Sequence, residues 1–212
     1  HLDFFKDIDD IRHSFRKFAE LLPADGALII NADTPKYEMV AENLPCKVIT
    51  YGLEHDAEYS ASDITYDEFG HPTFHVLHNG ADIGICSLKV PGIHNVSNAL
   101  ASIAAGRLLG LDNEVIFAGL KDFGGTDRRF QYKGKVGEVT IIDDYAHHPT
   151  EIEATLHAAN NYPHKKIWCV FQPHTYTRTK ALFPEFAEAL SHTDHVILAD
   201  IYAARETDTL GI

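Results

Sequence analysis

The chain has 212 residues, of which 45% are hydrophobic and 10% aromatic, and its formal net charge is −13. This much apolar surface can offset the conformational entropy lost on folding, so a disordered chain is excluded. The acidic surplus repels a phosphate backbone and no basic stripe opposes it, so we expect no nucleic-acid partner. No apolar run approaches the roughly 20 residues that cross a bilayer, so we expect no membrane partner either.

The cysteines indicate where the protein is located, and the two ends of the chain indicate whether it is part of a longer protein. Three cysteines, an odd number, lie far apart in apolar runs, which is typical of reduced thiols and predicts a cytoplasmic location. The chain begins at His1 with neither an initiator Met nor a signal peptide, and it ends at Ile212 without a closing helix. We therefore expect a piece of a longer protein.

The first half predicts a helix followed by strands. Apolar residues at three- and four-residue steps predict a helix over 8–22, and short apolar runs predict strands at 27–31 and 47–51. Polar and apolar residues alternate through 73–90 around Asn79-Gly80, a pair that favours the positive φ angles of a tight hairpin.

Helices then replace strands until a glycine-rich hinge. Two helices are expected, at about 95–109 and 112–121, and Gly124-Gly125 lies in the hinge between residues 121 and 129. Beyond it, strands and helices alternate, which predicts an α/β fold with a parallel sheet. The expected strands are 139–142, 167–171 and 196–199, and the expected helices are 150–160 and 180–191.

A polar cluster follows each strand of the second half. The clusters span 143–149, 172–178 and 200–206. Ligands of open α/β sheets bind outside the carboxyl ends of the strands, so these clusters should meet in space. Tyr145, His174 and Arg205 are therefore expected on the same side of the sheet.

Each polar residue also has a structural interpretation. Asp143 and Asp144 would serve as helix caps, and His148 before Pro149 is typical of a helix start. Arg178 and Arg205 would be solvated charges. His147 and His174 fit no apolar periodicity, which favours a polar role for both.

Two further groups are candidates for nucleotide contacts. Asn95 is either a helix cap or, with Asn98 one turn later, part of an amide pair suited to the edge of a purine. Arg128 and Arg129 beside the hinge are suited to binding an anion. The sequence contains no Gly-x-x-x-x-Gly-Lys-Thr phosphate loop, so any nucleotide site within it is incomplete.

Taken together, these motifs resemble the Mur ligases, the ATP-dependent amide-bond-forming enzymes of peptidoglycan synthesis. The resemblance covers the whole chain, and its longest motifs are most similar to those of members that join L-alanine to UDP-N-acetylmuramate. The residues that carry it are 143–151, 171–174 and 176–179, with 1–3, 91–95, 98–99 and 128–130 in the family's order.

The resemblance implies an α/β architecture of two parts. Residues 1–123 would be the second part of a central ATPase α/β domain with an antiparallel portion. Residues 124–212 would form most of a Rossmann-like C-terminal domain with a mainly parallel sheet. The UDP-binding domain and the phosphate loop would lie upstream, so the isolated fragment is expected to be inactive.

The resemblance also implies a mechanism and a role for each site residue. The muramate carboxylate would attack the γ-phosphate of ATP, and the amine of L-alanine would then attack the acyl phosphate. ATP and Mg²⁺ are the implied cofactors, with His1 as a magnesium ligand. The catalytic residues would be His147, His174 and Arg178; the ATP contacts Asn95, Asn98, Arg129 and Asp144; and the substrate contacts Tyr145, His174, Tyr176 and Arg178.

One departure and three alternatives remain. Some alanine-adding members have Arg where this chain has Thr175, so Arg178 would bind the alanine carboxylate without a second guanidinium. The alternatives are a murein peptide ligase acting on the same sugar, a nucleotide-binding module, and a phosphoesterase. The last would hold a metal with Asp144, His147, His148 and His174.

Overall fold

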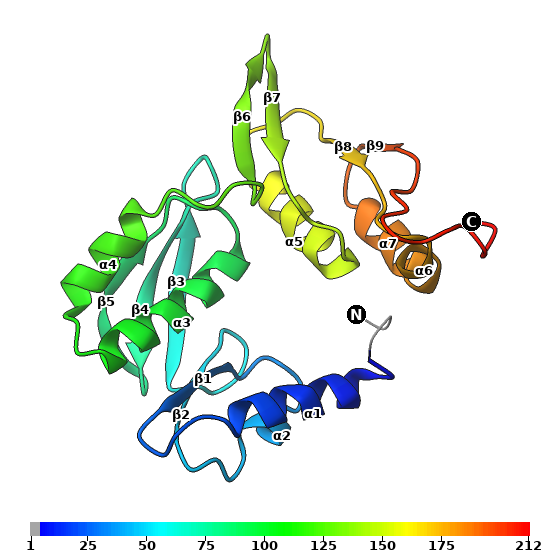
Figure 1. Cartoon of the computed structure of the whole chain (residues 1–212). Helices are drawn as coiled ribbons and strands as arrows, with labels where there is room; N and C mark the ends of the chain where they lie inside the picture. The colour runs from blue at the N-terminus through cyan, green and yellow to red at the C-terminus, as the bar shows by residue number, and fades with distance from the viewer. Residues whose placement is uncertain (1–4) are drawn as a thin grey trace. The chain divides into compact units, whose positions relative to one another are not determined.

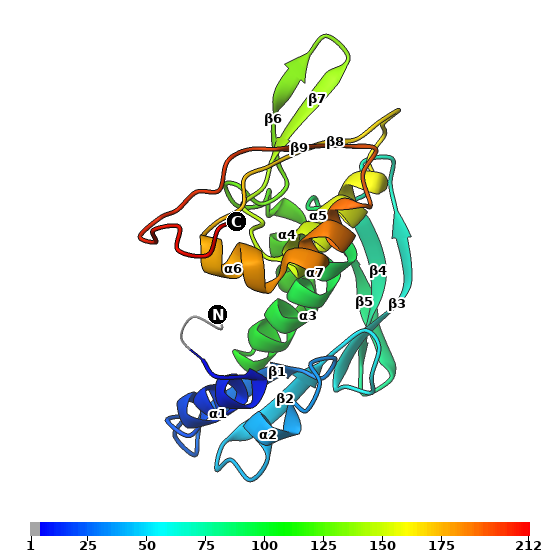
Figure 2. The same cartoon turned by 90° about the vertical axis from the view of Figure 1, so that its right-hand side faces the viewer.

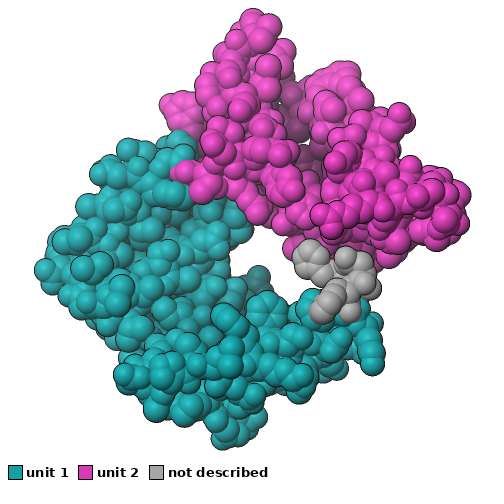
Figure 3. Space-filling model, in the orientation of Figure 1, with its two compact units in different colours: residues 1–67, 71–89, 93–124 teal, residues 68–70, 90–92, 125–212 magenta. Residues whose placement is uncertain are grey.

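The computed structural model describes residues 5–212, which divide into two compact units (Figure 3). Unit 1 comprises the residues up to 67 together with 71–89 and 93–124. Unit 2 comprises residues 68–70, 90–92 and 125–212. No helix within residues 5–212 combines the length and the apolar character needed to span a bilayer.

Unit 1 is built on a five-stranded sheet in the order β1-β2-β3-β4-β5 (Figure 1). Its parallel part joins β1 to β2 and β2 to β3, whereas β3, β4 and β5 pair antiparallel. The strands are β1 (Ala27–Asn31), β2 (Lys47–Tyr51), β3 (Tyr59–Tyr66), β4 (Pro72–His78) and β5 (Ala81–Ser87).

Four helices accompany this sheet, and α3 packs against it. The helices are α1 (Ile8–Ala19), α2 (Glu38–Ala41), α3 (Ile93–Leu108) and α4 (Asn113–Asp122). Leu100 and Ile103 of α3 are fully buried, as are Phe74 and Val76 of β4. Burial of these side chains is the main force that holds α3 to the sheet.

The sequence predictions for unit 1 hold except at one helix end. The strands at 27–31 and 47–51 are confirmed, and the hairpin turns through Asn79 and Gly80 at φ 51° and 77°. The helix expected over 8–22 ends at Ala19, because the N–H groups of Leu21 and Leu22 bond to the residues three positions back. Such bonds tighten and end a helix before Pro23.

Unit 2 contains two two-stranded sheets and three helices. Its elements are β6 (Gln131–Val136), β7 (Val139–Asp143), α5 (Pro149–Asn160), β8 (Trp168–Phe171), α6 (Tyr176–Ala181), α7 (Phe183–Leu190) and β9 (His195–Leu198). β8 and β9 pair parallel, as expected, whereas β6 and β7 form an antiparallel hairpin. α5 and α7 lie on the same side of β8 and β9 (Figure 2). Ile152, Leu156, Phe171, Phe186 and Leu190 form the core of this unit.

Unit 2 differs from the sequence predictions at two points. First, β7 pairs with β6, a strand that the sequence did not predict. A cavity of about 990 Å³ lies between β7, α5 and β8. Second, the helix expected over 180–191 is two helices that meet at Leu182, where φ is −116°. Pro184 lacks an N–H donor and so cannot continue the hydrogen bonds of the preceding helix.

Candidate functional site

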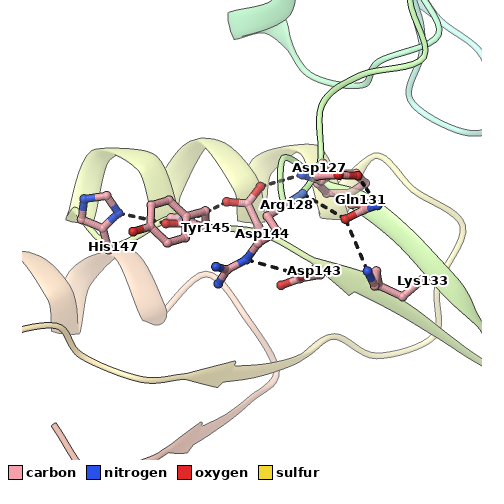
Figure 4. Close-up of polar contacts among 10 residues, drawn as sticks. Asp127, Arg128, Gln131, Lys133, Asp143, Asp144, Tyr145 and His147 are labelled. Atoms are coloured by element: carbon pink, nitrogen blue, oxygen red, sulfur yellow. Dashed lines mark hydrogen bonds and ion pairs between the residues drawn. The ribbon is translucent and has the colours of Figure 1, made fainter. Parts of the chain in front are cut away.

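Asp144 ties together two segments that are separated in the sequence. Its Oδ1 accepts a hydrogen bond from the Ala146 N–H at 2.7 Å, and its Oδ2 accepts one from the Phe130 N–H at 2.7 Å. The Tyr145 N–H donates to the Arg128 carbonyl at 2.8 Å. The turn at 128–130 is thereby fastened to the end of β7 (Figure 4). Sequence analysis did not identify this structural role of Asp144.

Arg128 is held by this loop rather than projecting freely. Its Nε lies 3.7 Å from Asp143 Oδ2, and its guanidinium carbon lies 4.6 Å from the centre of the Tyr145 ring (Figure 4). Its backbone φ is 58°, a left-handed conformation, and its N–H donates to Gln131 Oε1 at 3.0 Å. Arg128 thus contacts Asp143 and Tyr145, whereas the neighbouring Arg129 has its Nη1 3.9 Å from Glu151 Oε1.

The loop after β7 ends in a capped helix. His148 is the N-cap of α5 and Pro149 is its first residue, which confirms the predicted helix start. Glu151 Oε2 accepts hydrogen bonds from the N–H groups of His147 and His148 at 3.0 and 3.2 Å. Burial lowers the pKa of His148, which favours its neutral form.

Aromatic rings from all three polar loops form a continuous row. The ring centres of Tyr145 and His147 are 5.1 Å apart, those of His147 and His174 are 6.2 Å apart, and those of His174 and Tyr202 are 5.5 Å apart. His147 Nδ1 lies 2.9 Å from the Tyr145 carbonyl oxygen. Residues about 30 positions apart in the sequence are thus neighbours, and the predicted meeting of the three loops is confirmed.

Backbone pairing aligns the second loop with the third. His174 and Tyr202 form a parallel β-bridge beyond the ends of β8 and β9. The Tyr202 N–H donates to the Pro173 carbonyl and the Thr175 N–H donates to the Tyr202 carbonyl, each at 2.9 Å. Arg205 follows three residues later in the same loop and is exposed.

Thr175 adopts a strained conformation next to His174. Its φ of 68° and ψ of 142° lie where β-branched residues rarely occur, and such strain is concentrated at functional sites. α6 begins directly afterwards at Tyr176, which places Arg178 Nη1 3.5 Å from His174 Nδ1. A guanidinium can only donate, so a hydrogen bond between these two atoms requires Nδ1 to be the acceptor and the imidazole proton to be on Nε2.

The other predicted site residues are in unit 1 or outside the described residues. α3 starts at Ile93, so Asn95 lies in its first turn and is not its cap. Asn98 Nδ2 donates to Asn95 Oδ1 at 3.2 Å, so the two amides share one face of α3. His1, the predicted magnesium ligand, lies outside the described residues.

The predicted phosphoesterase metal centre is not formed. Within residues 5–212, no three or more His, Cys, Asp or Glu side chains are grouped so that they could hold a metal ion. Both oxygens of Asp144 already accept backbone hydrogen bonds. The phosphoesterase alternative therefore lacks its site.

Comparisons with known proteins agree with this geometry. The family model described as "Mur ligase middle domain" matches residues 1–106, and "Mur ligase, glutamate ligase domain" matches residues 128–209. The UDP-N-acetylmuramate–L-alanine ligase of Lachnospira eligens is 62% identical over 213 residues, which cover 100% of this chain and 46% of that protein. The chain thus spans about half the length of the curated relatives that it matches.

Two solved structures extend the likeness to the fold. The UDP-N-acetylmuramate–alanine ligase of Thermotoga maritima matches with a TM-score of 0.75 and 30% identity over 95% of this chain and 44% of that one. The murein peptide ligase of Psychrobacter arcticus matches with a TM-score of 0.64 and 27% identity over 92% of this chain and 41% of that one. Two family models, a relative that matches over the whole of this chain and solved structures with the same fold all agree. The chain therefore belongs to the Mur ligase family.

Proposed function

We propose that the protein of which this chain is a part joins L-alanine to UDP-N-acetylmuramate at the expense of ATP, in the cytoplasm. Residues 1–123 would form the second part of its central ATP-binding domain and residues 124–212 most of its C-terminal domain. The observation that carries the proposal is the row of rings from Tyr145 to Tyr202, with Arg178 beside it. Acyl transfer to an amino acid requires hydrogen-bond donors for the oxygen that becomes negative and a cation for the amino-acid carboxylate.

The reaction has two steps, and the chain contributes mainly charge and position. In the first step a carboxylate oxygen of the muramate attacks the γ-phosphorus of ATP, and ADP leaves. In the second the amine of L-alanine attacks the acyl carbon, phosphate leaves and the amine loses a proton. Phosphoryl transfer relies on positioning and charge neutralisation more than on covalent catalysis by the protein.

Each predicted residue has a role consistent with its surroundings. Arg178 would bind the alanine carboxylate, and the Nε2–H of His174 would donate to the oxygen that becomes negative when the amine attacks. His147, with Tyr145 and Tyr176, would line the same end of the site. Four further residues would contact ATP: Asn95 and Asn98 at adenine, Asp144 at the ribose and Arg129 at the phosphates.

His1, the magnesium ligand that the family resemblance implies, lies outside the described residues. No cluster of potential ligands is formed within residues 5–212, and the family resemblance places the ligand at His1. We therefore assign no step to a metal ion bound by this part of the chain.

The test is ADP release by the purified full-length protein with UDP-N-acetylmuramate and L-alanine. We expect continued release to require both substrates, because without L-alanine the reaction stops at the acyl phosphate after one turnover, and we expect the 212-residue chain alone to be inactive. Arg178→Ala should raise the KM for L-alanine more than the KM for ATP. A larger rise for ATP would contradict the carboxylate role, and tripeptide-dependent release without L-alanine would favour the murein peptide ligase alternative.

A further inference from the structure

Glu151 contacts both the backbone of the loop at His147 and the side chain of Arg129. It is the third residue of α5, and 34% of its side chain is exposed. Its Oε2 accepts hydrogen bonds from the N–H groups of His147 and His148 at 3.0 and 3.2 Å. Its other oxygen, Oε1, lies 3.9 Å from Arg129 Nη1. Oε2 thus holds the backbone turn and lies 3.5 Å from His147 Nδ1, whereas Oε1 faces a guanidinium.

The charge of this carboxylate is secured by its surroundings. Burial alone would raise the pKa of Glu151, but the N–H group and the ring charge of His147, the N–H group of His148 and the charge of Arg129 outweigh burial and lower it. Hydrogen bonds to the ionised form stabilise that form. At neutral pH the side chain is therefore negative and attracts a cation.

Arg129 depends on this contact for a defined position. Its side chain is 57% exposed, and in the described part of the chain its one ion pair is with Glu151. A long, exposed arginine loses rotamer entropy when it binds a ligand, and a partner that restricts it beforehand reduces that loss.

We propose that Glu151 is a positioning residue that holds the Arg129 guanidinium in register with the loop of Tyr145 and His147. The inference rests on the proposed function, in which Arg129 contacts the phosphates of ATP. Glu151 itself touches no reacting atom. Its effect on the nucleotide passes through Arg129, and its effect on the ring row passes through the backbone of His147 and His148.

Because the two oxygens of Glu151 have different partners, a substitution can change the contact with Arg129 and keep the backbone hydrogen bonds. In Glu151→Gln the amide oxygen can take the place of Oε2 and keep both backbone hydrogen bonds. The amide nitrogen then replaces Oε1 and faces Arg129 with a donor instead of a negative oxygen. Glu151→Ala removes both functions. Glu153→Gln is the matched control, because Glu153 lies on the same helix and its oxygen is also 3.9 Å from its partner, His157 Nε2.

The experiment measures binding of a fluorescent ADP analogue and thermal unfolding of the full-length protein. We expect Glu151→Gln to weaken ADP binding about two- to fivefold, the range of a partly exposed ion pair, without lowering Tm. Glu151→Ala should weaken binding as much and also lower Tm, because the helix cap is lost. Glu153→Gln should bind ADP as the wild type does.

A double substitution separates positioning from a general loss of structure. In an Arg129→Ala background, Glu151→Gln should have no further effect on ADP binding. Equal affinities of Glu151→Gln and Glu153→Gln, or additive losses with Arg129→Ala, would overturn the inference. Because binding is measured without L-alanine, these results stand apart from the ADP-release assay, whose failure would overturn the proposed function.

Discussion

Replacing Asp144 with alanine removes two hydrogen-bond acceptors from the loop after β7 at once. The N–H groups of Ala146 and Phe130 each lose a carboxylate partner at 2.7 Å. A hydrogen bond to a charged group contributes about 1.5–3 kcal/mol, and the lower end applies because these residues are only partly buried. Two such bonds give a loss of about 3 kcal/mol. Asp144→Asn keeps one acceptor oxygen and should lose about half as much.

Hydrogen exchange of the two amides measures this effect where it occurs. The loss of about 1.5 kcal/mol at each amide corresponds to about tenfold faster exchange, so Asp144→Ala should accelerate both Phe130 and Ala146. Asp144→Asn should accelerate one of them. Urea unfolding followed by the fluorescence of Trp168, which lies in the same unit, gives the global effect. Unchanged exchange at both amides and an unchanged urea midpoint in Asp144→Ala would refute the reasoning.

Two other predictions concern stability. Thr175→Gly should raise the free energy of unfolding by about 1 kcal/mol, because relief of the strain at φ 68° exceeds the entropy cost of glycine; a lower urea midpoint would contradict this. Burial would raise the pKa of Asp33, but N–H groups of Leu53, Glu54 and His55 outweigh it and lower the pKa. Its contribution is therefore present above its ordinary pKa of 3.8 and lost as pH falls through the lower folded value, so the difference in stability between wild type and Asp33→Asn should shrink as pH falls below 3.8. A constant difference between them from pH 7 to pH 2 would exclude this.

The sequence was most informative where one local rule decides the structure. The apolar runs at 27–31 and 47–51 are strands with the predicted bounds, and Asn79-Gly80 forms its turn because both residues adopt positive φ. The meeting of the second and third polar loops followed from the parallel pairing of β8 with β9, whereas the first loop follows β7, which pairs with β6 in a separate sheet. The expected chemical roles of the residues in these loops came from the family resemblance.

Features that depend on tertiary context were not predictable from the sequence. β6 carries Lys133, Gly134 and Lys135 and lies in a two-stranded ribbon, so it shows no apolar alternation. The double role of Asp144 depends on the turn at Phe130, fourteen residues away. A Glu three residues after a helix cap is a sequence signal, and it could have identified Glu151 as a capping residue. The contact between Glu151 and Arg129 could not be predicted from this signal.

The bridge between His174 and Tyr202 makes the third loop tolerant of substitution. The bridge uses main-chain groups of Pro173, Thr175 and Tyr202, so this part of the alignment does not depend on the side chains of residues 201–205. Residues 201–205 can therefore change their chemical character while the loop keeps its place, whereas Glu206 accepts hydrogen bonds from the N–H and the hydroxyl of Thr177. Related enzymes that accept other amino acids could vary this stretch at little structural cost, which makes it a natural place to redesign specificity.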